Sequence, residues 1–158
     1  MGNRIETLRD YLAKLLDEEG RKRSRFIENH LFAVSNFAAM IAMKRGLDPE
    51  IATMAGLLHD IYTALTGNSE KHAKLGAKLA RDILAKLDIA TPDEADVICS
   101  AIKHHSKKSS VHDPYSELVK DADVLSHYFY NVSYPVFEKD RERLKALAAE
   151  FGFGTGGI

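Results

Sequence analysis

The chain has 158 residues, of which 45% are hydrophobic, and its formal net charge is −1 with neutral histidines. This length suits one domain with a substantial core, and the near-zero charge gives no reason to expect a nucleic-acid or membrane partner. A single cysteine, Cys99, excludes a disulfide within the chain and favours a reducing compartment. We find no signal-peptide pattern and no apolar run of the roughly 18 residues that a membrane span needs, so we expect a cytoplasmic protein.

Helical patterns follow one another along the chain, and none of them alternates with the two-residue period of a strand. N-cap signals at Asp48, Ser69 and Thr91 and glycine stops at Gly20 and Gly46 separate the segments. The predicted helices cover about 4–19, 26–45, 49–60, 70–87, 92–105, 116–130 and 135–150. We therefore predict an all-α fold, a single compact bundle of six to seven helices over residues 1–150, followed by a flexible Gly-rich tail at 151–158. The basic run at 21–25 is interpreted as a solvated linker.

Histidines and aspartates lie on five of these predicted helices. They are His30, His59, Asp60, His72, His104, His105, Asp121 and Asp123. A helical bundle can bring such side chains from facing helices to one core site. Neutral imidazoles and carboxylates without a thiolate favour Mn, Fe, Co, Ni or Zn and leave Mg possible. A carboxylate among several imidazoles also suits a bridge between two metals that activate a water molecule.

The chain resembles the HD superfamily of metal-dependent phosphohydrolases over about residues 25–130. The resemblance rests on three features: a helical His30, the run Ala-Gly-Leu-Leu-His-Asp-Ile that contains His59 and Asp60, and the segment Ala-Asp-Val-Leu that contains Asp123. It implies that these four residues bind a first metal. Asp123 is preferred over Asp121 because it stands in the Ala-Asp-x-Leu frame, and Asp121, about 200° away around the helix, stays as an alternative.

A second metal is implied by two further segments that resemble members with two metals. His72 stands in a His-Ala-x-x-Gly-Ala segment, and His104 and His105 end the next histidine segment. Both of these adjacent histidines are expected to line the site, and the choice of ligand between them is left open. The resemblance thus implies one or two divalent transition metals, with His59 and Asp60 at the catalytic centre. His112 and His127 match no such role and are interpreted as surface or packing residues.

The sequence departs from the family pattern at a position that concerns phosphate binding. Many catalytic members place a lysine soon after His-Asp-Ile, whereas Tyr62 and Thr63 stand here. Lys71 and Lys103 are taken as substitute substrate-binding residues, with two further lysines nearby, Lys107 and Lys108.

The expected function is hydrolysis of a phosphoester or phosphoanhydride in a nucleotide or other small phosphorylated metabolite by metal-activated water. Two alternatives remain: a two-iron oxygenase with the same ligands, and a non-catalytic sensor that binds metal or nucleotide. A homodimer is a further open expectation, because five aromatic residues near 128–137 are candidates for an interface as well as for the core.

Overall fold

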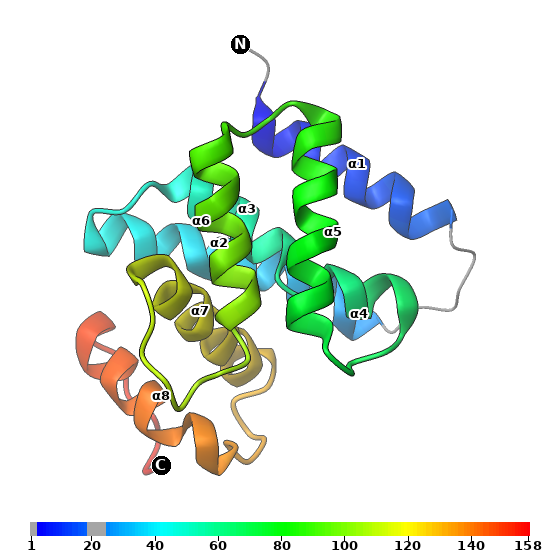
Figure 1. The fold of residues 1–158 in the computed structure, drawn as a ribbon. Helices are drawn as coiled ribbons and strands as arrows, with labels where there is room; N and C mark the ends of the chain where they lie inside the picture. Colours follow the sequence, from blue (N-terminus) through cyan, green and yellow to red (C-terminus); the bar gives the residue numbers. More distant parts are fainter. Residues whose placement is uncertain (1–2, 19–24) are drawn as a thin grey trace.

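The computed structural model describes residues 3–18 and 25–158, which form the bundle of helices in Figure 1. Within these two stretches every regular element is a helix, which confirms the predicted all-α class. The helices are α1 (Arg4–Glu18), α2 (Arg25–Arg45), α3 (Pro49–Leu58), α4 (Ile61–Thr66), α5 (His72–Leu87), α6 (Pro92–His104), α7 (Pro114–Tyr130) and α8 (Glu138–Phe151). The predicted linker lies outside the described residues except for Arg25, which begins α2.

The N-cap hydrogen bonds of two helices confirm their predicted starts. The carboxylate of Asp48 accepts hydrogen bonds from two backbone amides of α3, and Thr91 forms a capping box with Glu94 at the start of α6. The prediction lacks α4, the six-residue helix that directly follows His59 and Asp60. Gly67 ends α4 with a φ of 70°, a conformation that a residue without a Cβ adopts at little cost.

Three helix starts differ from the prediction. α5 begins at His72, and Ser69 supplies a backbone carbonyl to that residue instead of a side-chain cap. α7 begins at Pro114, because Asp113 caps it with a hydrogen bond from the Ser116 amide to its carboxylate. α8 begins at Glu138, a few residues later than its hydrophobic pattern indicates.

Helices α2 and α3 approach each other closely at the centre of the molecule. A Cβ added at Gly56 of α3 would lie 2.7 Å from the Cα of Ser35 in α2, closer than real Cβ atoms come. Glycine therefore lets the two backbones touch one turn before His59. The same contact brings the buried His30 of α2 beside the end of α3.

The segment Phe26–Arg45 is long and apolar enough, by length and composition only, to cross a membrane, with a hydropathy of 1.2. The prediction that no segment passes such a test is therefore wrong for α2. The core helix of a folded domain passes the same test, and α2 packs against α3 and α7 with Leu31, Val34 and Ile41 buried. Only part of the segment packs in the core, because 39% of its apolar window is buried while Phe32, Met40 and Met43 are exposed.

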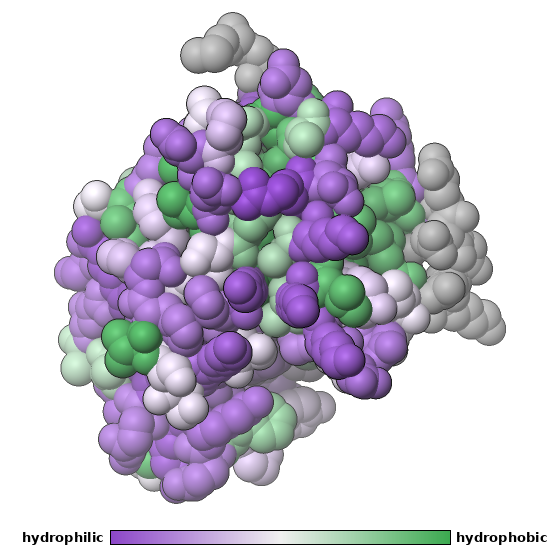
Figure 2. Space-filling model, in the orientation of Figure 1, coloured by the Kyte–Doolittle hydropathy of each residue, from purple (hydrophilic) through white to green (hydrophobic). Residues whose placement is uncertain are grey.

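The outer face over α5 and α6 is mainly hydrophilic, and hydrophobic side chains show there only in small areas (Figure 2). At the other end of the molecule, Phe153 of the C-terminal tail stacks against Tyr128 and meets the edge of Phe129, with ring centroids 6.3 and 5.3 Å apart. The tail thus has contacts with the bundle, and its flexibility stays a prediction.

We expect Gly56→Ala to lower the free energy of unfolding by about 1–3 kcal/mol, because the added methyl forces α2 and α3 apart. Gly76→Ala in α5 is the matched control, since a Cβ there meets its nearest neighbour at an ordinary 3.6 Å. Replacing a helical glycine by alanine then stabilises by up to about 1 kcal/mol. Urea denaturation of both variants measures the difference, and equal stabilities would contradict the close-packing argument.

Candidate metal centre

Three histidines of the predicted set each make the same type of hydrogen bond to the backbone. Nδ1 of His59, His72 and His105 lies 2.7, 2.8 and 2.7 Å from the backbone carbonyl oxygen three residues earlier in the chain. A carbonyl oxygen only accepts, so in each neutral ring Nδ1 carries the proton and donates it. Each Nε2 is left with a free lone pair directed away from the backbone, which is the state in which imidazole binds a metal.

Together with Nε2 of His30, these three Nε2 atoms form two facing pairs. Nε2 of His59 lies 3.1 Å from Nε2 of His30, and Nε2 of His72 lies 3.2 Å from Nε2 of His105. On the far side of His30, the Ser126 hydroxyl lies 3.0 Å from Nδ1 and fixes the ring. Nε2 carries a lone pair in both His72 and His105, and facing lone pairs repel, so a cation would be stabilised between these two rings.

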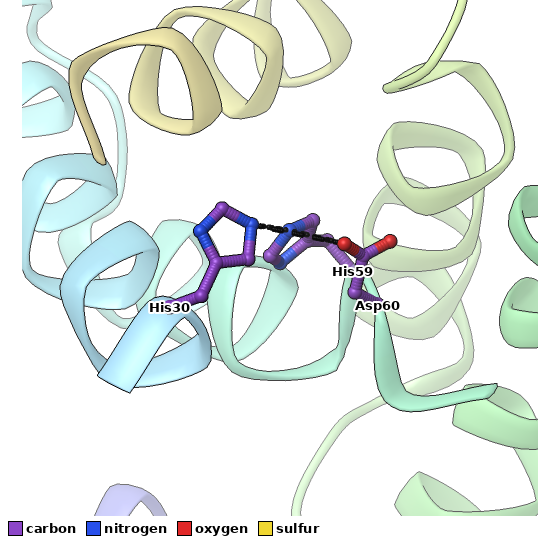
Figure 3. Close-up of side chains that lie close together, drawn as sticks. All are labelled: His30, His59 and Asp60. Carbon is purple, nitrogen blue, oxygen red and sulfur yellow. Dashed lines mark hydrogen bonds and ion pairs between the residues drawn. The ribbon is translucent and has the colours of Figure 1, made fainter. Parts of the chain in front are cut away.

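Asp60 lies between the two pairs of imidazoles. Its Oδ2 is 3.4 Å from Nε2 of His59 and 3.7 Å from Nε2 of His30, and Figure 3 shows these three side chains converging from α2 and the end of α3. Its Oδ1 is 3.2 Å from Nε2 of His105 and 3.4 Å from Nε2 of His72. The chain leaves the helical conformation at Asp60, with φ −114° and ψ 20°, and this break between α3 and α4 places the carboxylate between the pairs.

Asp123 of α7 completes the side of the site next to His30. Its Oδ1 lies 3.1 Å from Nε2 of His30 and 3.9 Å from Nε2 of His59. Its Oδ2 lies 2.5 Å from the ammonium of Lys108, whose side chain is almost fully buried. One turn further along α7, Nδ1 of His127 lies 3.8 Å from the same Oδ1.

Both carboxylates are anions at neutral pH. Burial raises the pKa of Asp60, but the neighbouring imidazoles of His59 and His105 outweigh burial and hold that pKa well below its usual range. Burial likewise raises the pKa of Asp123, but His30 and the nearby ammonium of Lys108 outweigh burial and hold that pKa well below its usual range. A metal ligand has to be deprotonated in this way.

The residues fit divalent metal ions. Ligand atoms lie within 4.8 Å of one another in three groups: His30, His59 and Asp60; His30, Asp123 and His127; and Asp60, His72 and His105. Oδ1 of Asp60 is buried and has no hydrogen-bond partner, so an ion bound there would satisfy it. Imidazole nitrogens with carboxylate oxygens suit Mn, Fe, Co, Ni or Zn.

Three predicted site residues lie elsewhere. His104 ends α6 one residue before His105, but its ring stacks on His112 with centroids 4.1 Å apart, so the structure brings only His105 to the cluster. Lys71 is exposed just before α5. Lys103 is exposed and lines a groove between α5 and α6 beside His104.

The choice between the two aspartates of α7 follows from their partners. Asp123 faces the imidazoles, whereas Asp121 forms ion pairs with Arg45 of α2 and Arg143 of α8 at 2.7 and 2.8 Å. Asp121 therefore ties three helices together and has a structural role.

Two residues, His127 and Lys108, lie at the cluster in roles that the sequence analysis did not assign to them. His127 was interpreted as a surface or packing residue, yet it shares a group of possible ligands with His30 and Asp123. Its spacing of four residues from Asp123 was a usable signal, because such residues share a helix face. Burial lowers the pKa of His127 and favours the neutral ring. Lys108 lies between α6 and α7, where helical periodicity gives no indication.

The sequence model of the HD domain family matches residues 27–128, more than half of the chain. The chain belongs to the HD domain family. It is thus a member of the superfamily of metal-dependent phosphohydrolases, as its motifs indicate, and every residue of the three ligand groups falls within the matched segment.

Curated relatives of this HD domain include several proteins named ribonuclease Y. That of Opitutus terrae is 32% identical over 128 residues, which cover 77% of this chain and 22% of that protein. That of Enterococcus faecalis is 36% identical over 126 residues, covering 76% and 22%. The chain thus spans about a fifth of the length of the relatives it matches.

A solved structure titled as a predicted HD superfamily hydrolase, from an uncultured Thermotogales bacterium, superposes with a TM-score of 0.59. The alignment covers 90% of this chain and 88% of that one, at 22% identity. This likeness confirms the fold over almost the whole domain.

We expect His105→Ala to lower the metal bound per chain from two ions to one, because His105 faces Oδ1 of Asp60, where the second ion would bind. His104→Ala is the neighbouring control and should keep both ions. Elemental analysis after loading with Mn²⁺ measures the stoichiometry, and circular dichroism verifies that each variant is folded. Loss of an ion in His104→Ala alone would overturn the assignment.

Proposed function

We propose that this HD domain is a two-metal phosphohydrolase that cleaves a phosphoester or phosphoanhydride bond, with Asp60 as the bridging ligand. The observation that carries the proposal is the position of Asp60, whose two oxygens each face a different pair of imidazoles. A carboxylate in this position suits a pair of ions better than one ion, because each oxygen has its own set of nitrogen ligands.

In this proposal the first ion is held by His30, His59, Asp60 and Asp123, and the second by Asp60, His72 and His105. Bound divalent ions would lower the pKa of a water molecule and neutralise the charge that develops on the phosphoryl oxygens. The protein itself fixes the ligands. Backbone carbonyls hold three imidazole rings in one tautomer, and the rings of His59 and His105 are buried away from bulk water.

Lys108 is proposed as the residue that positions Asp123. Its ammonium holds Oδ2, which leaves Oδ1 turned toward His30. It also places a positive charge beside the site, which matters because Tyr62 and Thr63 leave no cation directly after the His-Asp motif.

The substrate proposed is a nucleotide or another small phosphorylated metabolite, in line with the nearly neutral charge of the chain. A second candidate is a phosphodiester in RNA, and the specific support for it is the similarity to proteins named ribonuclease Y. A panel of nucleoside mono-, di- and triphosphates, a cyclic nucleotide and a short RNA distinguishes the two classes by released phosphate or by chain cleavage.

Asp60→Asn should reduce hydrolysis of the best substrate by more than about 100-fold, the upper end for changes that merely reorient a metal ligand. The amide keeps the shape of the side chain but loses the charge that two cations need. Asp96→Asn on the exposed side of α6 is the control, because Asp96 pairs with Arg81 at the surface, and the substitution should leave the rate unchanged. Full activity in Asp60→Asn would contradict the bridging role.

Lys108→Met should weaken metal affinity about 10–100-fold, as replacement of outer-sphere partners commonly does. Lys107→Met is the matched control, since Lys107 is adjacent in the chain and exposed. Titration of the metal-depleted proteins with Mn²⁺ gives the affinities. Equal affinity in both variants would show that Asp123 does not depend on the ammonium.

The two other activities make different predictions for the same preparation. An oxygenase would retain iron and consume oxygen, and a sensor would bind metal and nucleotide without turnover. Either result, together with no release of phosphate across the panel, would replace the hydrolase proposal.

A further inference from the structure

An aromatic cavity lies directly beside the metal centre, between α7, the start of α8 and the first turn of α2. Its volume is about 440 Å³, within the range of about 300–1,000 Å³ that small-molecule sites occupy. The residues of its wall used below are Phe26, His127, Tyr130, Phe137 and Asp140. None of them belongs to the ligand set derived from the sequence.

The side chain of His127 lies between the cavity and the metal centre and contacts both. On one side its ring stacks on His30, with centroids 4.7 Å apart and planes 11° apart, and its Nδ1 faces Asp123. On the other side its ring meets the edge of Phe137 at 6.4 Å. A molecule in the cavity would therefore lie one imidazole ring away from His30 and Asp123, which would hold the first metal ion.

The shape of the walls suits a flat aromatic group. Phe26 lies nearly parallel to His127, with centroids 6.3 Å apart, and Tyr130 stands perpendicular to Phe26 at 4.8 Å. Tyr130 and Phe137 are 53% and 62% exposed, so their surfaces are available to a ligand. Aromatic side chains of this kind stack on nucleobases, which present a π-face regardless of their identity.

Two lining residues of the cavity, His127 and Asp140, each have a buried polar atom without a hydrogen-bond partner, and the carboxylate oxygen of Asp140 can only accept. Asp140 is 2% exposed, and its Oδ1 has no hydrogen-bond partner. The ammonium of Lys108 lies 3.7 Å from this oxygen, too far for a hydrogen bond. An acceptor at the edge of an aromatic pocket fits the exocyclic amino group of a base, such as N6 of adenine.

We propose that this cavity binds the amino-bearing nucleobase of the substrate, with the base stacked on the aromatic wall and its amino group donating to Asp140. The proposal rests on the proposed function, in that the phosphate of the same molecule would reach the metal centre past His127. It narrows the substrate to a nucleotide and makes the cavity the determinant of specificity.

Binding of adenosine to the purified protein, measured by calorimetry, tests the cavity without requiring hydrolysis. Phe137→Ala should weaken adenosine binding at least about fivefold, the lower end for loss of one stacked aromatic. Phe32→Ala is the control, an exposed phenylalanine of α2 that does not line the cavity, and should bind as the wild type does. Purine riboside, which lacks the amino group, should bind about tenfold more weakly than adenosine because it offers Asp140 no donor.

No binding of adenosine to the wild type, or equal binding by Phe137→Ala and wild type, would overturn the proposal. So would a shift from dimer to monomer in Phe137→Ala with adenosine affinity unchanged, because the aromatic wall would then be an interface. Comparison of AMP with ribose 5-phosphate separates the two proposals: hydrolysis of both at equal kcat/KM keeps the phosphohydrolase and rejects the base site. Adenosine binding that depends on Phe137, without hydrolysis of either phosphate, keeps the base site and rejects the phosphohydrolase.

Discussion

The metal centre depends on one repeated contact, the hydrogen bond from Nδ1 of a histidine to the carbonyl oxygen three residues earlier. For His59 and His105 that carbonyl belongs to the last turn of a helix, and the carbonyl of Ile102 also accepts a bond of 3.4 Å from the backbone amide of His105. The side chain donates to the carbonyl, and the carbonyl fixes the tautomer. The result is an Nε2 lone pair with a defined direction.

The same geometry gives the site an electrostatic bias. α3 and α6 both end at the cluster, and the C-terminal end of a helix carries partial negative charge. The carboxylates of Asp60 and Asp123 add to this potential, so the centre is built for cations. Close contact at Gly56 and the ion pairs of Arg143 keep the elements in place. Arg143 joins Asp121 of α7 to the backbone carbonyl of Lys108, and so fixes the loop whose ammonium holds Asp123.

The sequence predicted most of the elements because hydrophobic period and capping chemistry are local. The capping box at Thr91 and the Asp48-Pro49 start needed no tertiary information. Ordered motifs also pointed to His30, His59, Asp60 and Asp123. The choice between His104 and His105 was beyond local reasoning, because the chain leaves the helix at this pair and the turn decides which ring faces inward. α4 was missed because six residues are too few to show a helical period.

Lys108 shows that a site can have a positive charge even when the lysine of the family motif is absent from the sequence. The position after His-Asp-Ile that carries a lysine in many relatives holds Tyr62 and Thr63 here, which by itself suggests a site unable to handle phosphate. In the folded chain a buried ammonium from a loop between α6 and α7 lies against Asp123 instead. Burying that charge is costly, and it is offset only because two carboxylates, Asp123 and Asp140, lie within 4.0 Å. The buried charge lies beside Asp123 and Asp140, where in the proposed function it would act on the phosphate of the substrate.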